Sequence, residues 1–161
     1  MRVEIRVPPD IDTRWLEREV ERALEMTMKG CAQLVANDAK QAVARGPKTG
    51  RTYTTRFKTN RTNGRIFPTE ARVPHTASAP GEAPATDTGK LVGSIVADAK
   101  GLKAYVEARS EYAIHLEYGT RNMAARPFIF PAVERNRDRI ANLLRAAVTS
   151  AMARFVEKSR G

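Results

Sequence analysis

A recurrence of apolar residues at three- and four-residue steps between residues 12 and 45 constrains the fold more than any other feature. This period is typical of an amphipathic α-helix, which Gly46-Pro47 ends and Gly30 interrupts with a bend or a close contact. At about 1.5 Å per residue such a helix is roughly 50 Å long, more than a small domain needs, which indicates packing between subunits. Its stripe comprises Leu16, Val20, Leu24, Thr27, Cys31, Leu34, Val35, Asp38 and Ala42, and Asp38 is the single charge in it.

A second apolar period predicts another long helix over residues 131–158. Alternation predicts strands at residues 2–7, 94–99 and 103–109, the last two joined as a hairpin. The chain of 161 residues is therefore expected to form a single α+β domain, residues 1–161, with two long helices packed on a small, mostly antiparallel sheet. The predicted inner side of the second helix comprises Val133, Ile140, Leu143, Leu144, Ala147, Val148, Ala151 and Phe155.

Residues 46–86 form a long basic loop or an extended hairpin in this prediction, a projecting arm on the domain. Tyr53–Phe57 and Arg65–Phe67 are its expected strands, around Asn63-Gly64. Residues 74–85 have the composition of a linker, which we interpret as mobile alone and ordered on assembly.

Residues 112–132 predict a short helix, a sharp turn, an extended piece and a helix start. Gly119 allows the turn after Tyr118 because glycine adopts backbone angles that other residues avoid. Pro127 forces Arg126 into an extended conformation, and Pro131 suits the first turn of the second long helix.

The same stretch, with a block upstream of it, resembles a family of tailed-phage proteins, the head–tail joining or tail-completion proteins, also described as minor tail components of the neck. The upstream block is Asp87-Thr88-Gly89-Lys90-Leu91 with Ser94-Ile95. The two blocks cover residues 86–132, and the order of the blocks is more specific than either block alone. We call the following residues the signature residues: Thr88, Gly89, Leu91, Ser94, Tyr112, Ala113, Glu117, Tyr118, Gly119, Thr120, Met123, Arg126, Pro127, Phe128, Pro131 and Ala132.

The net charge of +10 is concentrated in residues 45–72, which hold eight basic residues and one acidic residue. Such a segment contacts nucleic-acid phosphates, with Tyr53, Phe57 and Phe67 available to stack on bases, or it meets an acidic protein ring, or it is a solvated flexible arm. The sequence leaves these three interpretations open. The basic residues are Arg45, Lys48, Arg51, Arg56, Lys58, Arg61, Arg65 and Arg72.

The sequence offers little for catalysis or metal binding. Two histidines, His75 and His115, and one cysteine do not have the spacing of a zinc site. Ser94, Asp98 and His115 lack the turn that presents a nucleophile, and the glycines of residues 46–52 lack the spacing of a phosphate loop. We expect Glu107, Glu111 and Glu117 to be structural. Neither an enzyme nor a cofactor is therefore predicted.

Two functions from different classes remain as predictions. The resemblance implies a structural virion protein of the neck or the head-proximal tail end, made in the host bacterial cytoplasm. It implies a closed ring of six or twelve identical subunits between head-completion or connector proteins and a tail terminator or tail-tube protein, with non-specific contact to packaged DNA. The alternative is a stand-alone basic nucleic-acid-binding protein. No apolar run has the roughly 18 residues of a membrane span, and no secretory signal is visible.

Overall fold

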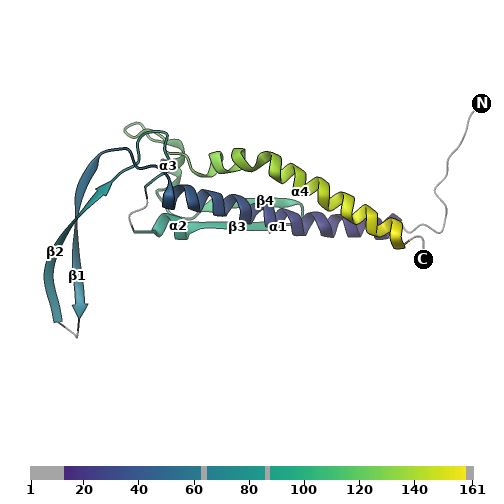
Figure 1. Ribbon diagram of the computed structural model, residues 1–161, viewed down its shortest axis with the longest axis horizontal. Coiled ribbons are helices and arrows are strands. Elements are labelled where there is room, and N and C mark those ends of the chain that lie inside the picture. The colour runs from purple at the N-terminus through teal and green to yellow at the C-terminus, as the bar shows by residue number, and fades with distance from the viewer. Residues whose placement is uncertain (1–12, 63–64, 86–87, 159–161) are drawn as a thin grey trace, which may run out of the picture.

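The computed structural model describes residues 13–62, 65–85 and 88–158, and it consists of helices and two β-hairpins (Figure 1). The strand predicted at residues 2–7, the Asn63-Gly64 turn and Asp87 lie outside the described residues. The elements are α1 Thr13–Arg45, β1 Thr52–Thr62, β2 Arg65–Thr76, α2 Lys90–Ser94, β3 Ile95–Lys100, β4 Lys103–Ala108, α3 Ala113–Tyr118 and α4 Ile129–Lys158. The predicted α+β class, with two long helices and small antiparallel sheets, is confirmed.

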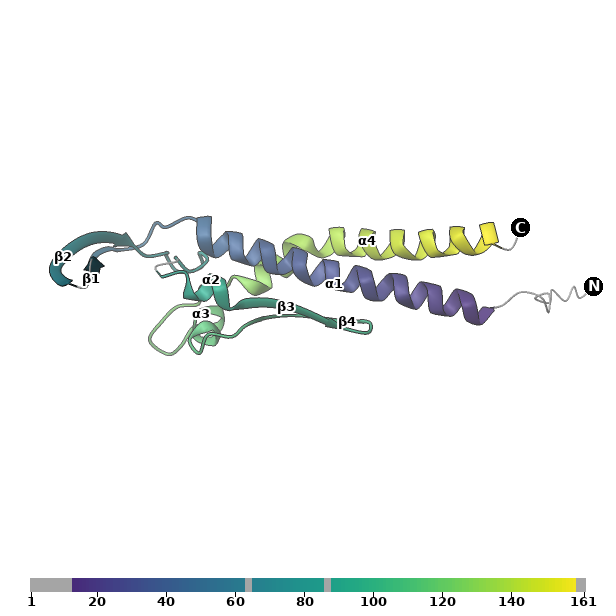
Figure 2. The ribbon, with the colours of Figure 1, turned by 90° about the horizontal axis from the view of Figure 1, so that it is seen from below.

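Helix α1 is the central element of the body. Helix α4 packs along one side of it and runs back in the opposite direction, so that the start of α1 and the end of α4 lie at the same end (Figures 1 and 2). The β3–β4 hairpin packs on another side of α1 (Figure 2). With 33 residues, α1 is about 50 Å long at the usual rise per residue, so the body is elongated.

The hydrophobic core lies in the C-terminal half of α1, where small side chains let other elements approach closely. Phe128, Ile95 and Val43 are its largest fully buried side chains. By contrast, none of the residues described between 14 and 30 is fully buried. The core consists of Val35, Ala36, Ala39, Val43, Leu91, Ile95, Ala113, Phe128 and Ala132.

At the end of the body where α1 begins and α4 ends, aromatic and charged contacts join the two helices instead of a broad core. The rings of Trp15 and Phe155 stack with their centroids 5.9 Å apart, and the Lys158 ammonium lies 4.3 Å from the Trp15 ring centre. Arg154 forms an ion pair of 2.9 Å with Glu19. These contacts bring the predicted stripe residue Phe155 against α1.

The predicted inner side of α4 is wrong at two positions. Val133 and Leu143 are 39% and 41% exposed, whereas Ala132, Asn136 and Ala151 are the buried residues of this helix. The physical reason is the close approach of α1, which accepts alanine better than a larger side chain at the line of contact. The apolar period gave the helix correctly but placed the contact line about one position away.

The β3–β4 hairpin follows its prediction closely. The strands pair antiparallel from Ile95 opposite Ala108 to Lys100 opposite Lys103. Half-buried and exposed residues alternate along β4, with Val106 half-buried on the side of the core. Period-two alternation thus identified both the element and its buried face.

The β1–β2 hairpin is longer than predicted and extends beyond the end of α1 (Figure 1). Its strands pair antiparallel from Thr52 opposite Thr76 to Thr62 opposite Arg65, with a register shift between Thr59 and Arg61. Residues 74–76 of the segment with linker composition belong to β2, and the N–H groups of Ala77 and Gly81 donate to the carbonyls of Arg51 and Ala125. The Gly50 N–H donates to the Ala77 carbonyl at 2.9 Å, and Ser78 is buried.

Candidate assembly site

Glu117 joins α3 to the start of α4 through a single carboxylate. Its Oε2 accepts hydrogen bonds from the Phe128 and Ile129 N–H groups at 2.9 and 3.1 Å, and its Oε1 accepts one from the Phe130 N–H at 2.8 Å. These N–H groups lie at a helix start, where no intrahelical acceptor exists, and an anion there also meets the positive end of the helix dipole. Glu117 is therefore a structural residue, as the sequence predicted, and its partners lie 11 to 13 positions further along the chain.

Gly119 makes the predicted sharp turn after Tyr118. Its φ is 75° and its ψ is −177°, in a region that side chains disfavour. A Cβ atom at this position would lie 2.8 Å from the Met123 carbonyl oxygen and 2.9 Å from the Ala125 nitrogen. Thr120 and Met123 then exchange backbone hydrogen bonds of 2.8 and 3.2 Å. Only glycine satisfies both the angle and the space.

The other signature residues divide between the core and the surface. Leu91, Ala113, Phe128 and Ala132 are buried, and the Ser94 hydroxyl donates to the Leu91 carbonyl at 2.8 Å. Ser94, Met123, Arg126, Pro127 and Pro131 are half-buried, whereas Thr88, Gly89, Tyr112, Tyr118 and Thr120 are exposed. Most of the signature therefore builds one interlocked unit, and the rest faces outward.

A groove with a volume of about 310 Å³ opens beside the Glu117 cap, between β4, α3 and the start of α4. Three of its apolar side chains are unusually exposed: Ile114 at 61%, Tyr118 at 80% and Phe130 at 66%. Contiguous exposed apolar surface of this kind marks interaction sites. Sequence reasoning did not identify this exposed face.

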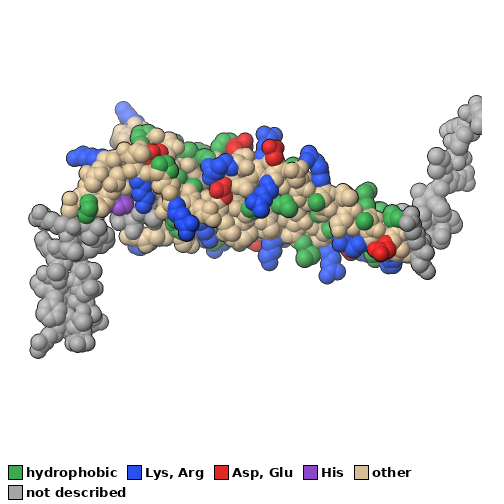
Figure 3. All heavy atoms as spheres, viewed as in Figure 1, with side chains coloured by type: hydrophobic (Ala, Val, Ile, Leu, Met, Phe, Trp, Pro, Cys, Tyr) green, Lys and Arg blue, Asp and Glu red, His purple; other side chains and the backbone are tan. Residues whose placement is uncertain are grey.

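The basic residues of 45–72 are distributed over several elements. Arg45 ends α1, Lys48 and Arg51 are exposed in the connection, and the others lie on the two hairpin strands. The register places Arg56 opposite Arg72 and Lys58 opposite Glu70. Lys and Arg side chains are spread along the visible face of the body in Figure 3.

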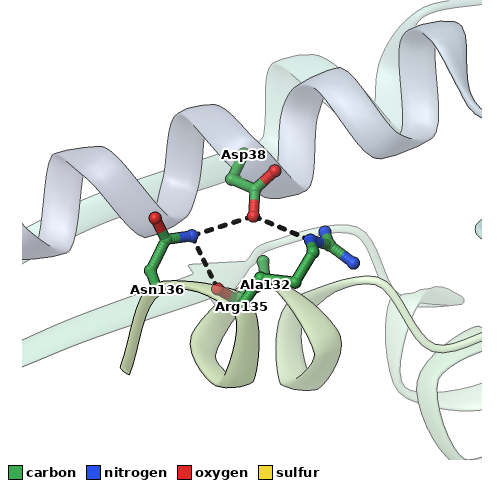
Figure 4. A network of polar contacts seen from close by, with 4 residues as sticks. All are labelled: Asp38, Ala132, Arg135 and Asn136. Carbon is green, nitrogen blue, oxygen red and sulfur yellow. Dashed lines mark hydrogen bonds and ion pairs between the residues drawn. The ribbon is translucent and has the colours of Figure 1, made fainter. Parts of the chain in front are cut away.

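Asp38, the single charge in the predicted apolar stripe of α1, belongs to a polar network between the two long helices (Figure 4). The Asp38 Oδ2 accepts a hydrogen bond from the Asn136 Nδ2 at 2.8 Å and one from the Arg135 Nε at 3.1 Å. Asn136 is buried and also donates to the Ala132 carbonyl at 2.8 Å. A charged residue on an apolar stripe was the available signal, but the partner 98 positions away was not visible.

A second carboxylate, Glu82, ties the connection after α1 to the segment after β2. Its Oε2 accepts hydrogen bonds from the Ala79 N–H at 2.7 Å and the Thr49 N–H at 3.2 Å, and its Oε1 accepts one from the Thr49 hydroxyl. The Thr49 hydroxyl, followed by the Ala79 and Thr49 N–H groups, lowers the pKa of this exposed carboxyl. Sequence reasoning missed Glu82.

The polar groups considered for chemistry make local contacts. The Ser94 hydroxyl donates hydrogen bonds to the Leu91 carbonyl and the Ser110 hydroxyl. The Asp98 carboxylate accepts a hydrogen bond from the Ala99 N–H at 2.8 Å. Burial raises the pKa of the Cys31 thiol, which disfavours the reactive thiolate. Within residues 13–62, 65–85 and 88–158, no three His, Cys, Asp or Glu side chains gather as a metal site would require.

Comparisons with models of protein families, with curated proteins and with solved structures gave no match to this chain. Among the helices of the described part of the chain, none has the apolar stretch that a membrane crossing needs.

Proposed function

We propose that the chain is a structural virion protein of a tailed phage or prophage, which forms a ring of identical subunits at the head–tail junction and joins the head connector to the tail. The observation that carries the proposal is the structural role of the signature residues. Glu117 caps α4, Gly119 makes a turn that admits no side chain, and Phe128 fills the core. These residues stabilise the fold. The residues that carry the resemblance therefore include ones that define the shape of the subunit.

The exposed apolar groove supports assembly as the mode of action. In a ring closed by heterologous contacts, each subunit covers one face of its neighbour with a different face of its own. Ile114, Tyr118 and Phe130 form such a face in the isolated chain, directly beside the rigid Glu117 cap. Aromatic residues on a fixed frame are common at the centres of protein interfaces.

The β1–β2 hairpin supports contacts with molecules beyond the subunit itself. It extends past the end of α1 (Figure 1) and carries Arg56, Lys58, Arg61, Arg65 and Arg72 on its two strands. Basic residues on a projecting element are suited to an anionic neighbour. In a neck ring this neighbour is packaged DNA in the channel or an acidic surface of an adjoining ring.

Residence in the virion neck, after synthesis in the host bacterial cytoplasm, is part of the same proposal. The ring has six or twelve subunits and lies between head-completion or connector proteins and a tail terminator or tail-tube protein. It performs no catalysis and needs no cofactor, because joining depends on complementary surfaces.

A stand-alone nucleic-acid-binding protein is the second candidate, and the same basic hairpin favours it. The two candidates differ in what the purified chain does in solution. Native mass spectrometry of the purified chain over a concentration series tests for a ring. The measurement is repeated after addition of a lysate that contains phage particles made without the chain. Duplex affinity measured between 50 and 200 mM salt, in steps of about 50 mM, tests for binding through phosphates, which weakens steeply as salt rises.

A ring of six or twelve copies supports the neck assignment. A monomer or dimer that binds duplex DNA with a steep salt dependence, and never forms a ring with particle components, supports the second candidate and overturns the first. Charge reversal at Arg56, Lys58 and Arg61 is the variant for the duplex titration, and reversal at Arg137 and Arg139, which are exposed on α4, is its matched control.

A further inference from the structure

The β1–β2 hairpin joins the body through two short connections. The first, residues 46–51, runs from the end of α1 to β1, and the second, residues 77–80, leads from β2 back to the body. The two connections pair with each other next to the hairpin, since the Gly50 N–H donates to the Ala77 carbonyl at 2.9 Å and the Ala77 N–H donates to the Arg51 carbonyl at 3.1 Å. The hairpin and the adjoining ends of both connections therefore form one continuous ribbon.

The segment that follows the second connection, residues 81–83, is attached to the body. The Gly81 N–H donates to the Ala125 carbonyl at 3.0 Å, in the stretch between α3 and α4. Ala83 packs against the hydrophobic core. The residue between them, Glu82, therefore extends from a point that the body holds in place.

The Glu82 carboxylate binds both connections at once. Its Oε2 accepts hydrogen bonds from the Ala79 N–H of the second connection at 2.7 Å and from the Thr49 N–H of the first at 3.2 Å. Its Oε1 accepts a hydrogen bond from the Thr49 hydroxyl. Hydrogen bonds to an ionised acceptor are stronger than those between neutral groups. One side chain thus ties the body to both connections of the hairpin.

We propose that Glu82 is a positioning residue, a latch that holds the β1–β2 hairpin at one angle to the body. Two chain segments of a few residues each allow a rigid element to swing, because their backbone dihedral angles absorb the motion. A carboxylate that is fixed to the body and binds both segments opposes that swing. The hairpin then extends beyond the end of α1 in one direction (Figure 1).

A fixed angle has a consequence only in an assembly, and this part of the inference rests on the proposed function. In a ring of identical subunits, every hairpin then presents its basic residues at an equivalent position. The latch itself is a property of one chain. Its test therefore succeeds or fails independently of whether the chain forms a ring.

The test is the distribution of distances between a spin label on the hairpin and one on the body, measured by pulsed electron paramagnetic resonance. The labels are attached at Thr59→Cys on β1 and Arg139→Cys on α4, in a Cys31→Ala background. A second pair, Arg22→Cys with Arg139→Cys, lies within the body and gives the width that the labels themselves contribute. Labelled chains are diluted in unlabelled chains, so that an assembly contains only one labelled copy.

Glu82→Ala removes the latch, and Glu82→Gln keeps the length of the side chain and one acceptor oxygen. Glu107→Ala is the control, because Glu107 is an exposed carboxylate of β4 whose ion pair with Arg109 involves neither connection. Circular dichroism and thermal unfolding verify that each variant folds.

We expect the hairpin–body distribution to be as narrow as the distribution within the body when Glu82 is present. Glu82→Ala broadens the first and leaves the second unchanged, Glu82→Gln has an intermediate effect, and Glu107→Ala has none. Amide hydrogen exchange of Thr49 and Ala79 becomes about tenfold faster in Glu82→Ala, as the loss of a hydrogen bond to a charged acceptor predicts.

A hairpin–body distribution that is already broad with Glu82 in place shows that the hairpin swings freely, and one that stays narrow in Glu82→Ala shows that other contacts fix the angle. Either result overturns the proposal. Broadening of both distributions in Glu82→Ala overturns it too, because Glu82 would then stabilise the whole fold instead of positioning the hairpin.

Discussion

The Oδ2 atom of Asp38 in α1 lies 2.8 Å from the side-chain nitrogen of Asn136 in α4, and this contact joins the two long helices at a partly buried point of their interface. The same nitrogen also donates a hydrogen bond to the Ala132 carbonyl, so two acceptors fix the orientation of the Asn136 side chain. Alanines on both helices let the backbones approach closely around it. A polar pair in such a position fixes the register of the helices.

A double-mutant cycle measures that coupling. Asp38→Ala, Asn136→Ala and the double variant are compared by urea denaturation, and the coupling free energy is expected to be about 1–2 kcal/mol. The exposed pair Glu107 and Arg109, joined at 2.7 Å, is the control and should couple by less than about 0.5 kcal/mol. Equal coupling in the two cycles would show that the network between the helices has no special role.

Glu117→Gln should lower the free energy of unfolding by about 2 kcal/mol, since an amide removes the charge and one of the two acceptor oxygens at the start of α4. Glu134→Gln, at an exposed position of the same helix, is expected to change it by less than about 0.5 kcal/mol. Chemical denaturation of both variants gives the comparison. Similar losses would mean that the three hydrogen bonds of Glu117 contribute no more than a surface charge.

Two glycine substitutions should have opposite signs. Gly119→Ala is expected to destabilise the chain by about 2 kcal/mol or more, because φ is positive and the new Cβ would meet the Met123 carbonyl. Gly30→Ala should stabilise it by about 1 kcal/mol, because nothing lies within 4 Å of the new Cβ in mid-helix. Thermal unfolding reports both, and stabilisation by Gly119→Ala would refute the proposed turn.

The Glu82 contacts should be lost at acidic pH. Its pKa in the folded chain is lowered from the usual 4.5, so its contribution is complete above the unfolded value and disappears as pH falls through the folded value. The amide resonances of Thr49 and Ala79 should therefore titrate with a midpoint below pH 4.5 and stop doing so in Glu82→Gln. A midpoint at or above that value would contradict the hydrogen bonds that Glu82 accepts.

Charge reversal at Arg56, Lys58 and Arg61 should leave the body folded, because these residues lie on a hairpin that extends beyond it. The expected results are an unchanged thermal midpoint and impaired head–tail joining in a complementation assay. Reversal at Arg137 and Arg139 is the control for net charge. Fully infectious particles from the hairpin variant would show that the hairpin charges are dispensable.

The sequence predicted those parts of the fold that follow local periods and local turn chemistry. The apolar period gave α1 to within one residue of its start, and Gly119 and Pro131 marked the turn and the first turn of α4. The long β1–β2 hairpin was predicted only in part, since its residues 74–76 sit among Pro, Ala and Ser that favour a linker interpretation.

Contacts between distant positions were outside the reach of the same reasoning. The core line on α4 depends on how closely α1 approaches, which selected Ala132 instead of Val133. The hydrogen bonds of Glu117 and of Glu82 each form between segments that meet only in the folded chain. Both residues are acidic, and the sequence alone does not show which N–H groups a carboxylate will bind.

The composition of purified particles tests the central claim most directly. The proposed function requires the gene for this chain to lie in a phage or prophage genome. Particles produced from that genome are purified, and the copies of the chain per particle are counted by quantitative mass spectrometry against the portal protein. Membership of a neck ring predicts a fixed number of six or twelve copies in every joined particle. Its absence from infectious particles with attached tails would contradict a structural role at the head–tail junction.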